Sequence, residues 1–182
     1  MTMVKLSDPL PSLVADAMVI HHFAKADRLD VLGACVVQMT TTNIVADEIE
    51  RYVHHYPSLV SLAKLEWLQI LPQDTDEELI ALHRWAALLG AGAYDLGEAS
   101  VFAAAETHSM IALTDDRDAT RVGRRRGLEI HGTVWLLTRL YALQKMTLVE
   151  ICGHVDALRS TGMRLPCTGT ELPRWAQHHG LL

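Results

Sequence analysis

The sequence predicts an α/β domain in which a mostly parallel sheet carries helices on both of its faces, giving three α/β/α layers. Two observations predict this fold. Short apolar runs of strand length alternate along the 182 residues with longer segments that have helical apolar spacing. Carboxylates directly follow two of the apolar runs, at Asp16 and at Asp115-Asp116. Ligands bind beyond the carboxyl ends of strands in such sheets, so both features indicate one fold with a site at that edge.

Five apolar runs, bounded by polar or turn-forming residues, are predicted to be strands. The first is closed by Asp16, the second is β-branched, and the third is stopped by Pro72. They are 13–15, 35–39, 67–71, 110–114 and 128–131.

The helices are predicted from apolar spacing and from their capping residues. Thr40 to Asn43 supply polar caps for a helix that runs to about His55, where Pro57-Ser58 breaks it. Gly127 ends a basic helix. The predicted helices are 18–26, 29–32, 43–55, 58–64, 77–89, 95–108, 118–126, 133–144 and 148–160, and the tail after Pro166 is irregular with a short final helix. We expect one domain over 1–182, with a core of about 12–145 and a helical C-terminal extension of about 147–182.

Composition limits the classes of function. The net charge of −6 argues against nonspecific nucleic-acid binding through overall charge, although it permits a local basic surface. No run reaches membrane-spanning length and no signal peptide is visible, so a cytoplasmic protein without membrane contact is expected. The cysteines, Cys35, Cys152 and Cys167, are too widely spaced for a zinc motif and are interpreted as buried thiols.

Two helical acids lie on apolar stripes. Glu48 continues the i, i+3, i+4 pattern that Val45 and Ile49 define, although it could instead reach water at the edge of that stripe. Asp47 lies off the stripe and is predicted to face solvent. Glu98 shares a face with Phe102, but Asp95 and Glu98 also have the spacing of a capping box. Simple capping or turn roles are likewise open for Asp16 and for Asp115-Asp116, with Asp118 then capping the next helix.

Together these acids predict one acidic pocket at the sheet edge. Such a pocket repels itself unless a cation fills it, and Mg²⁺ or Mn²⁺ prefers oxygen ligands. The cation would activate water and neutralise charge on a phosphate. The predicted catalytic residues are Asp16, Glu48, Glu98, Asp115 and Asp116, and the predicted metal ligands are Asp16, Glu98, Asp115 and Asp116.

A basic stripe follows Asp115-Asp116 directly. Arg117, Arg121 and Arg124 recur at helical spacing, and we expect them to bind the RNA backbone. The alternative is an ordinary solvated helix face, which is the usual meaning of a charge run.

The acid-bearing motifs resemble those of the PIN-domain nucleases, in particular the VapC-like toxins of prokaryotic toxin–antitoxin modules. The similar segments are Val14 to Ile20, Val45 to Ile49, Asp95 to Ala99, Leu113 to Arg117 and Gly127 to Leu137. The resemblance covers about residues 12–165. It implies a Rossmann-like sheet and a metal-dependent ribonuclease, often dimeric and often inhibited by a cognate antitoxin.

The sequence hypothesis is therefore a Mg²⁺- or Mn²⁺-dependent endoribonuclease that acts as the toxin of a toxin–antitoxin pair. Its partners would be RNA, a cognate antitoxin and, in a homodimer, a second copy of the chain. One alternative is a non-catalytic PIN-like binding module. A phosphatase or phospho-acceptor domain is a weaker alternative, because Asp16-Ala17-Met18 lacks the second acid of a phosphatase motif and no lysine follows the fifth strand.

Overall fold

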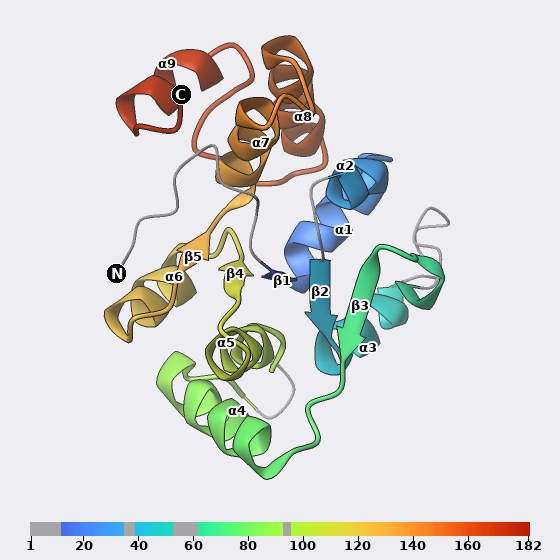
Figure 1. Cartoon of the computed structure of the whole chain (residues 1–182), viewed down its shortest axis with the longest axis vertical. Helices are drawn as coiled ribbons and strands as arrows, with labels where there is room; N and C mark the ends of the chain where they lie inside the picture. Colours follow the sequence, from blue (N-terminus) through green and yellow to red (C-terminus); the bar gives the residue numbers. More distant parts are fainter. Residues whose placement is uncertain (1–11, 35–38, 53–61, 93–95) are drawn as a thin grey trace.

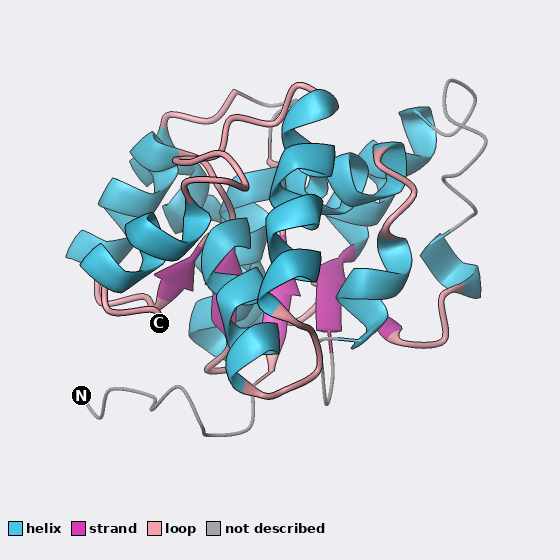
Figure 2. Cartoon of the chain, turned by 90° about the horizontal axis from the view of Figure 1, so that it is seen from above, coloured by secondary structure: helices cyan, strands magenta, loops and turns pink. Residues whose placement is uncertain are grey.

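The computed structural model describes residues 12–34, 39–52, 62–92 and 96–182. Over these residues the chain forms a parallel sheet with strand order β3-β2-β1-β4-β5, flanked by helices (Figures 1 and 2). The predicted α/β fold with a central parallel sheet is confirmed. The strands are β1 (Leu13–Ala15), β2 (Met39–Thr42), β3 (Leu68–Leu71), β4 (Ile111–Leu113) and β5 (Ile130–His131).

Helices connect successive strands, as a parallel sheet requires. Helices α4 and α5 pack along each other, and α5 also contacts β1, β2 and β4. None of the described helices is both long and apolar enough to cross a membrane. The helices are α1 (Ala17–Lys25), α2 (Leu29–Ala34), α3 (Asn43–Tyr52), the 3-10 turn η2 (Leu62–Lys64), α4 (Asp76–Leu89), α5 (Gly97–Thr107), α6 (Arg117–Arg125), α7 (Thr133–Ala142), α8 (Leu148–Ser160) and α9 (Leu172–His178).

The second strand differs from its prediction. The structure places β2 at Met39–Thr42, whereas the sequence predicted 35–39, of which 35–38 lie outside the described residues. The predicted capping threonines are thus mostly strand residues, because β-branched side chains suit a buried strand. The Thr41 hydroxyl donates to the Ala15 carbonyl at 2.9 Å, which ties β2 to β1. Thr42 keeps a capping role, since its hydroxyl accepts from the Val45 amide at 3.1 Å.

Most helix boundaries lie within two residues of the predicted ones. Helix α6 begins at Arg117, and Asp116 caps it, so the alternative in which Asp118 is the cap is wrong. Gly127 ends this region with a φ of +91°, a left-handed conformation that suits glycine. The predicted end of α3 at His55 and its break at Pro57-Ser58 lie outside the described residues.

The C-terminal helices α7, α8 and α9 gather at one end of the molecule, at the top of Figure 1. Helix α7 has more apolar positions than one helix face requires. In the structure α8 packs against α7 and the apolar residues Val134, Leu136, Leu137 and Leu140 are buried within the chain. The surplus therefore serves intramolecular packing, and a homodimer remains a proposal.

Candidate active site

Three strand ends lie side by side at one edge of the sheet. Ala15 pairs with Leu113, and Leu113 pairs with His131, so the residues that follow them form a row that contains Asp16 and Thr114. The connections after β1 and β4 progress to opposite sides of this strand pair, as the order β3-β2-β1-β4-β5 requires. This edge is therefore the switch point at which α/β sheets bind ligands.

Asp16 is buried at this point. Its Oδ1 accepts the Ala17 amide at 2.7 Å, and its Oδ2 accepts the Thr114 hydroxyl at 3.2 Å. Burial raises the pKa of Asp16 from 3.8 to about 7, against the lowering effect of these two hydrogen bonds. The negative charges of Glu48 and Asp115 raise the pKa further. Asp16 is thus the N-cap of α1, as one alternative held, and also a buried carboxyl group whose ionised form is disfavoured by burial and by the neighbouring acids.

Glu48 approaches from α3. Val45 and Ile49 of the same stripe are buried, and Glu48 itself is half-buried, whereas Asp47 is exposed as expected. The Glu48 carboxylate lies against the start of α5, because a Cβ atom added to Gly97 would be 2.6 Å from Oε2 of Glu48. A glycine at position 97 therefore makes room for this carboxylate.

Glu98 follows Gly97 directly and lies in the first turn of α5. It is half-buried, and Phe102 on its stripe is fully buried. The N-cap of α5 is Leu96, which makes no side-chain capping hydrogen bond, and Asp95 lies outside the described residues. Because Gly97 touches the carboxylate of Glu48, the helix start brings the segments of both acids together, at a position where the helix dipole favours negative charge.

The two acids after β4 have different roles. Asp115 is half-buried and accepts the Thr133 amide at 3.0 and 3.2 Å and the Thr133 hydroxyl at 2.6 Å. Burial raises the pKa of Asp115. Asp116 is exposed, and its Oδ1 accepts the Ala119 amide at 2.7 Å as the N-cap of α6. Of the two, Asp115 is therefore the acid whose charge acts on Asp16.

The side-chain groups around Asp16 that could bind a metal ion are carboxylate and hydroxyl oxygens. Oxygen donors of this kind fit Mg²⁺ and Mn²⁺ and do not suit softer metals. No group of three or more His, Cys, Asp or Glu side chains among the described residues has the spacing of a preformed metal site.

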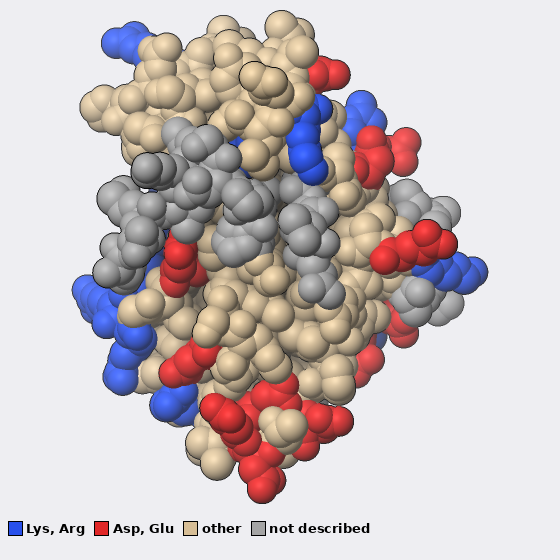
Figure 3. Space-filling model, viewed as in Figure 1, with Lys and Arg blue, Asp and Glu red and all other residues tan. Residues whose placement is uncertain are grey.

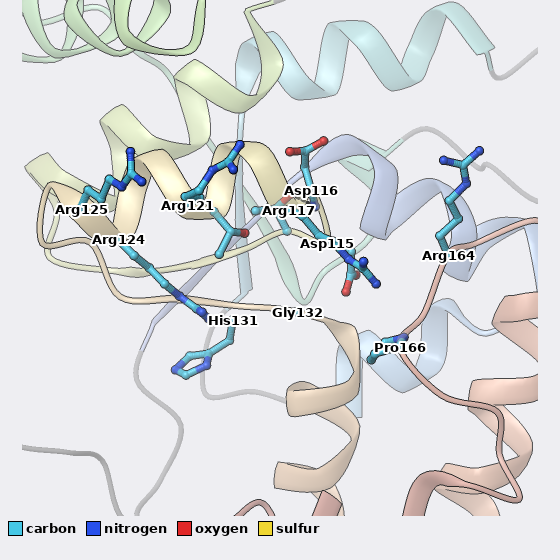
Figure 4. A pocket seen from close by; sticks show the side chains of 12 residues that line it. Asp115, Asp116, Arg117, Arg121, Arg124, Arg125, His131, Gly132, Arg164 and Pro166 are labelled. Atoms are coloured by element: carbon cyan, nitrogen blue, oxygen red, sulfur yellow. Dashed lines mark hydrogen bonds between the residues drawn. The ribbon is translucent and has the colours of Figure 1, made fainter. Parts of the chain in front are cut away.

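An open cavity of about 520 Å³ adjoins Asp115 and is strongly basic. Its lining includes the predicted RNA-binding residues on α6, and Figure 3 shows blue side chains over α6 at the left edge of the view. Arg124 also donates to the Ile130 carbonyl at 2.6 Å, and Arg121 pairs with Asp118 at 2.6 Å. The cavity is lined by Thr114, Asp115, Asp116, Arg117, Thr120, Arg121, Arg124, Arg125, His131, Gly132, Arg164 and Pro166 (Figure 4).

Several site residues were missed from the sequence. Thr114 directly precedes the predicted acids and Thr133 follows the fifth strand, so their positions at strand ends were an available signal. Gly132 lies so close to Asp115 that an added Cβ would be 2.5 Å from Oδ1, which no sequence pattern reveals. Arg164 lies far along the chain in a segment predicted to be outside the core, and only the folded structure brings it to the cavity.

Comparison with known proteins agrees with the geometry. Residues 12–171 match the family model DUF3368, which describes a PIN domain. A search of curated proteins found no match. PIN domains are generally nucleases and typically use divalent metal ions. With the family model covering most of its length and the acids at the switch point of a parallel sheet, this chain belongs to the PIN-domain family.

Proposed function

We propose that this chain is a Mg²⁺- or Mn²⁺-dependent endoribonuclease that hydrolyses RNA phosphodiester bonds. One observation carries the proposal: the Asp16 carboxyl group is buried, and the like charges of Glu48 and Asp115 act on it. Acids are rarely held in this way unless a positive partner completes the arrangement. The adjoining arginine-lined cavity supplies the positive surface that a phosphodiester needs.

The acids have distinct supports in this proposal. Asp16, Glu48, Glu98 and Asp115 would hold the divalent ion, which when bound supplies a nucleophilic water and offsets charge on phosphate. The Thr133 amide and hydroxyl fix the orientation of the Asp115 carboxylate. Such supporting hydrogen bonds keep carboxylates in the orientation that a ligand set requires.

The RNA backbone would lie along α6. Arg117 and Arg121 line the cavity beside Asp115, so phosphates bound there are next to the acids. Arg126 is exposed on the same helix end but is not among the lining residues. We therefore expect Arg121→Ala to weaken binding of single-stranded RNA about tenfold, as one lost charge-assisted contact would. The matched Arg126→Ala variant should bind RNA as wild type does, and an equal loss in both variants would contradict this assignment.

The biological context that we propose is a toxin–antitoxin pair, in which a cognate antitoxin protein binds this chain and a homodimer is the functional unit. This part of the proposal is supported by the resemblance of the acid motifs to VapC-like toxins. Expression of the chain alone should arrest growth of a bacterial host, and Asp16→Asn should relieve the arrest. Arrest by both forms would separate the effect from nuclease activity.

Cleavage of a total RNA pool tests the enzymatic proposal. Wild type should produce fragments with Mg²⁺ or Mn²⁺ and none with EDTA. Asp16→Asn should lower the rate on the order of 100-fold or more while the melting temperature is not lowered. Asp47→Asn is the matched control, since Asp47 is an exposed acid of α3. Full cleavage by Asp16→Asn would refute the assigned role.

The competing function is a non-catalytic binding module. It would need no metal site, and no preformed group of three or more His, Cys, Asp or Glu ligands is found among the described residues. A working site should bind Mn²⁺ and raise the melting temperature, because a ligand of the native state stabilises that state. A binding module would show RNA binding with no cleavage and no Mn²⁺-dependent stabilisation.

A further inference from the structure

The segment that follows α8 has a regular alternation of burial. Met163, Leu165 and Cys167 are buried, whereas Arg164 and Pro166 between them are exposed. A period of two is the pattern of an extended chain with one face on the core. The apolar residues therefore hold this segment down and turn the Arg164 side chain outward.

Both ends of the segment are anchored. The hydroxyl of Thr161 lies 2.7 Å from Nδ1 of His22, and Nζ of Lys25 donates to the Thr161 carbonyl at 3.0 Å. Both partners belong to α1, the helix that Asp16 caps. Further along, the Arg159 guanidinium donates to the Leu165 carbonyl at 3.0 Å. These contacts fix the backbone around residue 164 relative to the helix that begins at the acidic site.

Arg164 lines the same cavity as Arg117 and Asp115. In Figure 4 it lies on the far side of Asp115 from Arg121 and Arg125, on the loop after α8. The cavity therefore has cations on both sides of the acids, from two elements far apart in sequence. Arg164 makes no hydrogen bond or ion pair with the part of the chain that the structure describes, so its donors are available to a ligand.

We propose that Arg164 is a substrate-positioning residue that binds a backbone phosphate of RNA on the side of Asp115 opposite to α6. The inference rests on the proposed ribonuclease function and adds a second anchor to it. A strand held by Arg121 on one side and Arg164 on the other would pass over Asp115, which places a phosphodiester beside the acids. The C-terminal extension is then part of the substrate site.

Arginine suits this role. Its planar guanidinium can donate two parallel hydrogen bonds to one phosphate, and it stays charged at any working pH. Because hydrogen bonds already hold the backbone around Arg164, mainly side-chain freedom is lost when the phosphate contact forms, which lowers the entropic cost of binding. Arg159 differs, because its guanidinium donates to the Leu165 carbonyl of its own chain.

Binding of a fluorescent single-stranded RNA 30-mer to the full chain, measured by anisotropy in EDTA at several KCl concentrations, tests the proposal. Arg164→Ala should weaken binding about tenfold at low salt. The slope of log Kd against log salt should fall in magnitude by about 0.7, the value for one phosphate contact to a single strand. Arg164→Lys should keep most of that slope, because the charge is retained. Arg174→Ala is the matched control, since Arg174 is an exposed arginine of α9 outside the cavity.

The outcomes are distinguishable. The inference is overturned if wild type binds and cleaves RNA while Arg164→Ala and Arg174→Ala have equal salt slopes, and the ribonuclease proposal then stands. If wild type neither binds nor cleaves RNA, the proposed function and the inference fall together. If wild type and Arg164→Ala have equal melting temperatures, a loss of binding comes from the missing contact. A lowered melting temperature with an unchanged slope of log Kd against log salt would assign Arg164 a structural role and refute the proposal.

Discussion

Replacing Asp16 with asparagine should change how stability depends on pH. Burial and the neighbouring acids raise the native pKa of Asp16 from 3.8 to about 7. Between these two values the native state keeps a proton that the unfolded state has released. The unfolding free energy of metal-free wild type therefore falls as pH rises from about 4 to about 7. The Asp16→Asn variant has no such proton and lacks this part of the decline.

The magnitude follows from the shift. Each pH unit in this window costs about 1.4 kcal/mol, so wild type should lose about 3 kcal/mol more than Asp16→Asn between pH 5 and pH 8. Urea unfolding at both pH values, in EDTA, measures the difference. The exposed-acid variant Asp47→Asn should follow wild type, because it removes a charge without relieving the buried one. Parallel pH profiles of wild type and Asp16→Asn would show that Asp16 is not under this electrostatic strain and would refute the reasoning.

Two further predictions separate neighbouring roles. Asp115→Asn should lower RNA cleavage on the order of 100-fold, since its charge acts on the buried acid, whereas the exposed cap variant Asp116→Asn should lose less than about tenfold; equal losses in the cleavage assay would be inconsistent with these roles. Gly97→Ala should displace the Glu48 carboxylate and lower cleavage about tenfold without lowering the melting temperature. The control is Gly153→Ala in the middle of α8, where an added Cβ meets open space. It should stabilise the native state by about 0.5 to 1 kcal/mol and leave cleavage unchanged.

The sequence was sufficient where local patterns carry the information. The apolar runs predicted four of the five strands nearly in place, and α8 was predicted over the observed Leu148–Ser160. The stripe argument correctly distinguished the half-buried Glu48 from the exposed Asp47. These successes share a cause, because a single buried face dictates both the periodicity and the orientation of the acid on it.

Tertiary contacts decided the rest. The second strand was missed because Thr40 to Thr42 have both strand propensity and capping ability, and only pairing with β1 and β3 selects the strand. The different environments of Asp115 and Asp116 depend on the distant Thr133, which bonds to the first of them. Long-range contacts of this kind leave no pattern within a local window of sequence.

Calorimetric titration of the metal-free chain with Mn²⁺ tests most directly whether Asp16, Glu48 and Asp115 form one cation site. Wild type should show saturable binding, Asp16→Asn should bind more than about tenfold more weakly, and Asp47→Asn should bind as wild type does. Mn²⁺ binding that is absent in wild type, or unchanged by Asp16→Asn, would contradict a shared site at the carboxyl ends of β1 and β4.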